Sequence, residues 1–234
     1  MESKRLMSLI FLFVILFVSG CSLDKQDPIE QKGNIDNISE KNLDVAKEKI
    51  RIVAFGDSLT QGYGLNRNEA YPAQLQFLLD NKNYLTTVFN SGLSGETTTG
   101  AAQRVDWVLQ LNPDIVILAI GANDAFRGVD IDIIEKNLRQ IIESLLDNDV
   151  LIILGGMDIV ENLGQTYVNE FENLYPRLAQ EYNLYFIDSF LGRVAGNSDY
   201  NQVDEIHPTK EGYNIIVNEN IFPVLEQVLQ EKFN

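Results

Sequence analysis

The sequence contains a single cysteine and a single histidine among its 234 residues. One cysteine excludes an internal disulfide framework, and one histidine with one cysteine argues against a zinc site built from these residue types. Positive charge is also scarce, because 18 lysines and arginines stand against 34 aspartates and glutamates and give a formal net charge of −16. We therefore expect no nucleic-acid partner, since binding by counterion release requires a basic surface.

Residues 1–20 have the pattern of a secretory signal peptide. Lys4 and Arg5 form a basic start, and the apolar run over residues 6–18 is followed by the small residues Ser19 and Gly20. A helix needs about 20 apolar residues to cross the hydrocarbon core of a membrane, so a permanent transmembrane span is the weaker interpretation of this shorter run.

Cys21 directly follows Val18, Ser19 and Gly20, and this tetrad resembles the lipobox of bacterial lipoproteins. The alternative interpretation of Cys21 is a small buried hydrophobic residue. The resemblance implies cleavage before Cys21, a diacylglyceryl group on its sulfur and, usually, an acyl chain on the new amino terminus. Two or more acyl chains anchor a protein stably, so we expect an exported lipoprotein that is anchored to a membrane on the periplasmic side or at the cell surface.

Residues 21–49 predict a flexible linker behind this anchor. The stretch after Cys21 has no aromatic residue, many charged residues, and Pro28 and Gly33 as breakers. A flexible coil of this length has a root-mean-square span of about 30 Å. That span is enough to hold a domain clear of the lipid headgroups.

From Ile50 onward, short apolar runs alternate with longer amphipathic ones, which is typical of a parallel sheet with helices on both faces. We expect one doubly wound α/β domain over residues 50–234. The predicted strands are Ile50–Phe55, Leu85–Phe89, Asp114–Ile120, Val150–Leu154 and Leu184–Ile187. The predicted helices are Tyr71–Asp80, Thr98–Leu109, Asp132–Leu146, Tyr167–Tyr182 and one from Thr209 onward, with Pro223 as a candidate break.

Polar loops follow the predicted strands, at the edge where such a sheet binds its ligand. They are Gly56–Leu59, Asn90–Gly95 and Gly121–Asp124, and a fourth polar segment, Asp204–Pro208, lies near the C-terminus. Each alone is also ordinary turn chemistry, since glycine supplies unusual φ values and aspartate or serine caps the next helix. Their expected convergence at one edge favours a catalytic site.

Ser58, His207 and Asp204 supply the residue types that acyl transfer needs. A serine hydroxyl is a poor nucleophile until a base takes its proton, and histidine suits that role near neutral pH. The imidazole in turn needs a carboxylate that fixes its tautomer. Asp204 lies three residues before His207, and Pro208 disfavours helix there, so we expect the pair on a loop before the last helix. The alternative for His207 is a surface or packed histidine.

The negative charge that develops on the substrate carbonyl oxygen requires fixed donors. The backbone N–H groups of Ser58 and Gly95 and the side-chain amide of Asn123 are the natural candidates. Glycine at position 95 allows close approach of the backbone to a ligand, and Asn123 donates without carrying a charge.

The four polar blocks resemble those of the SGNH hydrolases, also called GDSL esterases/lipases, from about Ile52 to the C-terminal helix. The similarity is greatest to bacterial arylesterases and acyl-CoA thioesterase I/lysophospholipase L1, through residues 56–64, 94–97 and 175–179. It implies a three-layer α/β/α sandwich of the flavodoxin-like kind with a five-stranded parallel sheet. It also implies a Ser58–Asp204–His207 triad, Gly95 and Asn123 in the oxyanion hole, and no metal or cofactor.

One segment departs from the family pattern. After the fourth strand many relatives read Gly-Met-x-x-Pro-Pro-Asn, whereas residues 156–162 here read Gly-Met-Asp-Ile-Val-Glu-Asn. The matching loop contacts the acyl chain in the family, so we expect a differently shaped acyl pocket.

The leading function is a serine esterase that cleaves short-chain or aryl esters, acyl thioesters or lysophospholipids through an acyl-enzyme intermediate. One alternative is a carbohydrate O-deacetylase on cell-wall sugars, since related folds remove acetyl groups. A second alternative is a lipid-anchored binding protein without enzymatic activity, for which Ser58→Ala would change nothing measurable.

Overall fold

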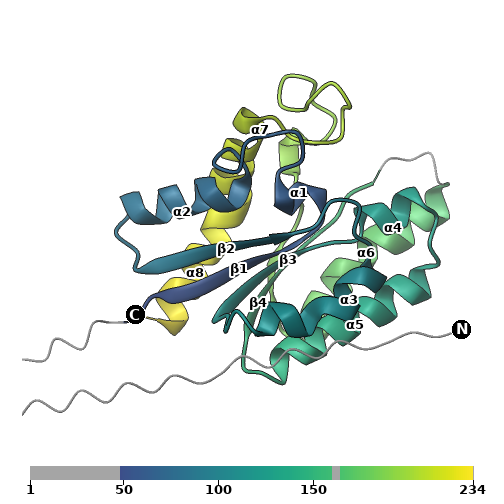
Figure 1. The fold of residues 1–234 in the computed structure, drawn as a ribbon. Coiled ribbons are helices and arrows are strands. Elements are labelled where there is room, and N and C mark those ends of the chain that lie inside the picture. The colour runs from purple at the N-terminus through teal and green to yellow at the C-terminus, as the bar shows by residue number, and fades with distance from the viewer. Residues whose placement is uncertain (1–47, 160–163, 234) are drawn as a thin grey trace, which may run out of the picture. The chain divides into compact units, whose positions relative to one another are not determined.

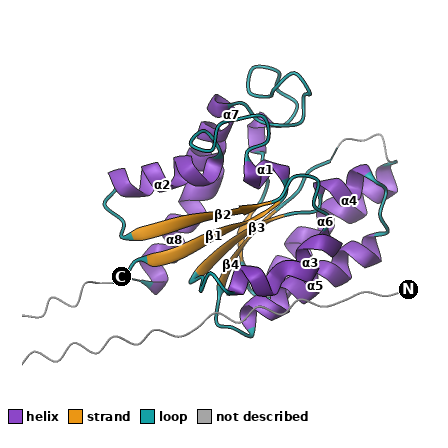
Figure 2. Cartoon of the chain, in the orientation of Figure 1, coloured by secondary structure: helices purple, strands orange, loops and turns teal. Residues whose placement is uncertain are grey.

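A computed structural model describes residues 48–159 and 164–233 of the chain. Five parallel strands form one sheet in the order β2-β1-β3-β4-β5. Figure 2 shows β2, β1, β3 and β4 of this sheet in orange. The predicted five-stranded sheet is confirmed, and every strand bound differs from its prediction by three residues or fewer. The strands are β1 (Ile50–Gly56), β2 (Thr86–Gly92), β3 (Ile115–Ala119), β4 (Leu151–Gly155) and β5 (Tyr185–Ile187).

Helices cover both faces of the sheet, which confirms the three-layer sandwich (Figure 1). One face carries α2 (Tyr71–Asn81), α7 (Lys210–Ile215) and α8 (Phe222–Lys232). The other carries α3 (Thr98–Leu109), α5 (Ile131–Leu146) and α6 (Gln165–Glu181). The core lies between these layers, and every residue of the central strand β3 is buried because helices shield it on both sides.

The signal segment, Cys21 and the predicted linker up to residue 47 lie outside the described residues. Among the helices of the described ranges, none combines the length and the apolar composition that crossing a membrane requires.

Helix α5 shows how the sequence pattern produces this packing. Asp130 caps the helix, since its carboxylate accepts a hydrogen bond from the Asp132 N–H at 3.0 Å. Its apolar residues recur at spacings of three and four, so they form one stripe that faces the sheet and α3. The buried members of this stripe are Ile134, Leu138, Ile141, Ile142 and Leu145.

Pro223 does not end the C-terminal helical segment. A proline has no N–H, so the Glu219 carbonyl loses its usual helical donor. The chain accommodates this loss by widening to a π-helical segment, η3 (Ile216–Ile221), in which the Phe222 N–H donates to the Val217 carbonyl. Helix α8 then begins with Pro223 in its first turn, where a missing N–H costs little.

Position 56, the last residue of β1, requires glycine because a side chain would not fit there, and not because of an unusual backbone angle. A Cβ at this position would lie 2.1 Å from the Ala119 carbonyl oxygen and 2.4 Å from the Thr60 hydroxyl oxygen. The unusual φ expected of a glycine in this turn is therefore absent at Gly56, whereas Gly95, in the loop after β2, has a φ of 77°. The capping prediction for Asp57 is confirmed, because its carboxylate accepts from the Leu59 N–H at 3.0 Å.

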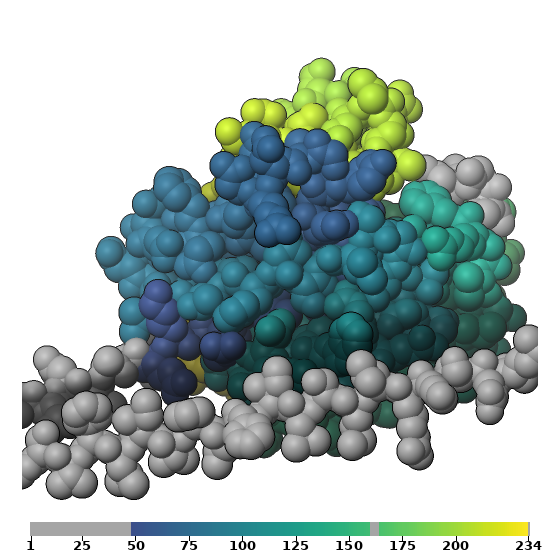
Figure 3. All heavy atoms as spheres, in the orientation of Figure 1, coloured from purple at the N-terminus to yellow at the C-terminus, as the bar shows by residue number. Residues whose placement is uncertain are grey.

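The strand order places the polar loops together. Strand β1 lies between β2 and β3, so the loops after these three strands meet at the point where the winding of the sheet reverses. The segment before α7 joins them: Figure 3 shows its yellow-green atoms packed against the blue atoms of the chain that follows β1. The Gln202 side chain bridges the two, donating to the Tyr63 carbonyl at 2.7 Å.

Candidate active site

The structure brings Ser58, His207 and Asp204 into one hydrogen-bonded chain. Ser58 is the half-buried first residue of the short helix α1 (Ser58–Gln61), directly after β1. The Nε2 atom of His207 lies 2.8 Å from Ser58 Oγ, and its Nδ1 atom lies 2.7 Å from Asp204 Oδ2. As the sequence predicts, Asp204 and His207 lie on a loop before α7.

Asp204 is held by a tight turn around its own carboxylate. Its Oδ1 atom accepts hydrogen bonds from the backbone N–H groups of Ile206 and His207, both at 3.0 Å. Burial by itself would raise the pKa of Asp204, but these bonds and the His207 imidazole outweigh it and lower the pKa to about 2. An ionised carboxylate only accepts, so in the neutral ring the hydrogen stays on Nδ1 and Nε2 is left to accept from Ser58.

Gly95 lies on the loop after β2 and lines the same cavity as Ser58 and His207. Its N–H donates to no other residue in the described part of the chain, and it is therefore available to a ligand. The guanidinium of Arg127 donates to the Gly95 carbonyl at 3.0 Å. This bond helps to hold the peptide in its left-handed conformation.

Asn123 enters the cavity from α4 (Ala122–Phe126), the short helix after β3. Its Nδ2 atom donates to Asp57 Oδ2 over 3.2 Å. The neighbouring Asp124 is fully buried and accepts from the N–H and the hydroxyl of Thr98 at 2.8 and 2.7 Å. Burial raises the pKa of Asp124, and its bonds fix α4 to the start of α3.

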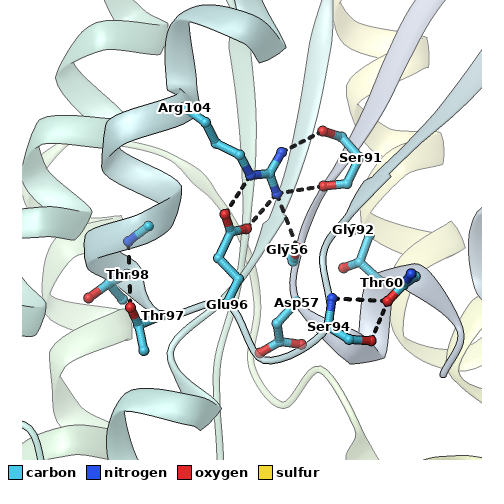
Figure 4. A network of polar contacts seen from close by, with 12 residues as sticks. Gly56, Asp57, Thr60, Ser91, Gly92, Ser94, Glu96, Thr97, Thr98 and Arg104 are labelled. Carbon is cyan, nitrogen blue, oxygen red and sulfur yellow. Dashed lines mark hydrogen bonds and ion pairs between the residues drawn. The ribbon is translucent and has the colours of Figure 1, made fainter.

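A nearly buried ion pair between Glu96 and Arg104 supports the Gly95 loop (Figure 4). Two guanidinium nitrogens of Arg104 each lie 2.5 Å from a carboxylate oxygen of Glu96, and the two side chains are 16% and 3% exposed. The same guanidinium donates to the Ser91 carbonyl at 2.8 Å and to the Gly56 carbonyl at 3.4 Å. This network joins the ends of β1 and β2 to the loop that presents Gly95.

Sequence reasoning missed this ion pair and the Asp57–Asn123 bond. The only signal was position: Glu96 follows Gly95, and Asp57 precedes Ser58. Neither position identifies a partner.

Ser58, Gly95, Asn123 and His207 line a cavity of about 290 Å³, which is close to the lower limit of the volumes usual for small-molecule sites. The Tyr63 ring forms part of its wall and packs against the His207 ring, with the centroids 4.7 Å apart. Met157 and Asp158 line the cavity beside β4, whereas residues 160–162 of the divergent loop lie outside the described residues. The other apolar lining residues are Leu59, Ala122, Phe126, Leu191 and Ile206.

A sequence profile of the GDSL-like lipase/acylhydrolase family matches residues 54–215. This range contains the sheet from the middle of β1 onward, together with Ser58, Gly95, Asn123 and the His207 loop. The chain belongs to the GDSL-like lipase/acylhydrolase family. This match confirms the predicted family, and with the relatives below it confirms a carboxylic ester hydrolase of the arylesterase and thioesterase 1 type.

Individual relatives agree with this membership. The chain is 30% identical to the arylesterase of Vibrio mimicus over 167 residues. These residues are 71% of this chain and 82% of that protein. It is also 30% identical to thioesterase 1/protease 1/lysophospholipase L1 of Escherichia coli (strain K12) over 168 residues. These residues are 71% of this chain and 79% of that protein. The crystal structure of the psychrotrophic esterase EstA from Pseudoalteromonas sp., inhibited by monoethylphosphonate, matches with a TM-score of 0.72 and 29% identity and covers 77% of this chain and 98% of that chain.

Proposed function

We propose that this GDSL hydrolase cleaves small carboxylic esters through an acyl-enzyme intermediate on Ser58. Ser58 Oγ attacks the ester carbonyl carbon while its proton moves to His207 Nε2. The tetrahedral intermediate then expels the alcohol, which takes that proton from His207. A water molecule, deprotonated by His207, attacks the acyl group and releases the acid and the free serine.

The oxyanion formed in both steps would accept hydrogen bonds from the N–H groups of Ser58 and Gly95 and from the Asn123 side-chain amide. The observation that carries the proposal is the hydrogen-bonded chain from Asp204 through His207 to Ser58, which ends in the cavity. Because that cavity is small and mostly apolar, we expect a preference for short acyl groups. Thioesters and lysophospholipids present the same acyl half and belong to the same panel of test substrates.

Active-site labelling tests this mechanism. A fluorophosphonate should add one phosphonyl group, located by mass spectrometry on Ser58, and p-nitrophenyl butyrate should give an initial burst of about one equivalent of p-nitrophenol. Ser58→Ala should not be labelled. Ser94→Ala, which removes the other serine of the cavity wall, should still be labelled on Ser58. Modification of a different residue, or none, would contradict the proposed nucleophile.

A panel of acyl esters separates the substrate classes. We expect kcat/KM to be highest for acetyl to butyryl p-nitrophenyl esters and to fall for longer chains, because the described cavity is small. The same panel should contain acetylated sugars, acyl-CoAs and lysophospholipids. A large preference for the acetylated sugars would replace this substrate class with the O-deacetylase alternative.

We further propose that the enzyme is tethered to a membrane by a lipid on Cys21. The support is the sequence Val18-Ser19-Gly20-Cys21 behind a short apolar run. In full-length protein expressed in a bacterium, Cys21→Ser should remove the lipid mass and move the activity from the membrane fraction to the soluble fraction. Ser22→Ala is the matched control and should stay in the membrane fraction. Membrane retention of Cys21→Ser would instead support an uncleaved apolar segment.

A further inference from the structure

Asp57 is a fully buried carboxylate that the steps of acyl transfer do not use. It lies between β1 and α1, beside the nucleophile. One oxygen accepts from the Leu59 N–H at 3.0 Å and caps the helix that carries Ser58. The other accepts from the side-chain amide of Asn123, 66 residues further along the chain, at 3.2 Å. A single side chain thus joins the nucleophile helix to an oxyanion donor.

Helix capping alone does not account for an aspartate at this position. Serine and asparagine cap helix N-termini about as well as aspartate does, and neither buries a charge. Burial disfavours the ionised form and raises the pKa of Asp57 to about 6, although the bonds from Leu59 and Asn123 and the nearby His207 act in the opposite direction. A carboxylate retained at this cost to stability indicates a use for its charge.

That use lies in the orientation of the Asn123 amide. The oxygen and nitrogen ends of an amide are almost the same size, so sterics alone do not decide which end faces the cavity. An ionised carboxylate has no hydrogen to donate, so it can pair only with the NH₂ end. We propose that Asp57 is a positioning residue that turns the NH₂ group of Asn123 toward the cavity, where its second hydrogen meets the oxyanion. This inference rests on the proposed function, in which Asn123 is an oxyanion donor.

Asp57→Asn tests the inference, because it keeps the size and the capping oxygen but places an NH₂ group opposite Asn123. The Asn123 amide should then flip and present its carbonyl oxygen to the oxyanion. We expect kcat for p-nitrophenyl butyrate to fall on the order of 10²- to 10³-fold, as in Asn123→Ala, with KM changed less than about threefold.

The double variant Asp57→Asn/Asn123→Ala separates this role from a general structural one. If Asp57 acts through Asn123, the double variant should have the same kcat as Asn123→Ala, within about threefold. Asp130→Asn is the matched control, because Asp130 caps α5 in the same way but lies on an exposed helix end; its kcat should be unchanged. If Asp57→Asn does not fold, Asp57→Ser keeps a capping oxygen and can replace it in the same cycle.

Two results would overturn the inference: a kcat for Asp57→Asn within about threefold of the parent, or losses that multiply in the double variant. A normal kcat for Asn123→Ala would overturn the proposed oxyanion role of Asn123 together with this inference. A loss in Asn123→Ala with normal kcat in Asp57→Asn would overturn this inference alone. Melting temperatures from circular dichroism should show that each variant is folded at the assay temperature.

Discussion

Replacing His207 with alanine should lower kcat for ester hydrolysis on the order of 10⁶-fold while the protein remains folded. The imidazole Nε2 atom lies 2.8 Å from Ser58 Oγ, so its loss leaves the hydroxyl without a base. The sequence contains no second histidine, and no other imidazole can take over. Steady-state hydrolysis of p-nitrophenyl butyrate by the purified variant at pH 8 measures the effect.

Glu205→Gln is the matched control for this variant. Glu205 is exposed and lies in the same turn as Asp204 and His207, so its substitution tests the loop without touching the hydrogen-bonded chain. Its kcat should stay close to that of the parent. Activity of His207→Ala within about tenfold of the parent, with an unchanged circular dichroism spectrum, would contradict the assignment of His207 as the base.

The second large effect is expected for Asp204→Asn, which should lower kcat on the order of 10⁴-fold. The carboxylate accepts from His207 Nδ1 at 2.7 Å and so leaves Nε2 free to accept the serine proton. An asparagine can turn its NH₂ group toward Nδ1, which places the ring hydrogen on Nε2 instead. Stopped-flow acylation rates should show the loss in the acylation step. A loss confined to KM would contradict this role.

The pH dependence of stability gives Asp204 a second signature. Its folded-state pKa is lowered from the ordinary 3.8 to about 2, so the carboxylate binds a proton less readily in the folded than in the unfolded chain. Its stabilising contribution is therefore complete above about pH 4 and is lost as the pH falls through about 2. Urea unfolding should show the parent more stable than Asp204→Asn at pH 5, with the difference shrinking towards pH 2. A difference that grows at low pH would contradict the lowered pKa.

Strand positions were predictable because buried parallel strands are continuous apolar runs. The largest error was at the end of β2, which continues through Asn90 and Ser91 to Gly92. These three residues pair with Ala54, Phe55 and Gly56 of β1. Backbone hydrogen bonds to a neighbouring strand extended β2 beyond its apolar run, and no local pattern reports such a partner.

The bonds between the loops were less predictable. The sequence contains 34 acidic residues, and nothing near Arg104 in the sequence indicates which of them it pairs with. Its bond to Glu96 follows only from the packing of α3 beside the end of β2. In the same way, the residues around Asp57 indicate only a helix cap. Its second hydrogen bond, from the Asn123 side-chain amide, forms because the chain after β3 places Asn123 beside it.

The sequence by itself determined the class of fold, the order of the polar blocks and which of their side chains have the chemistry that acyl transfer needs. These features depend on apolar periodicity and on side-chain chemistry, both of which are local. Only the tertiary structure decided that Ser58 and His207, 149 residues apart, share a hydrogen bond, and that Asp57 contacts Asn123. Such contacts depend on strand order and loop path, which arise when the whole sheet packs and cannot be read from any one segment.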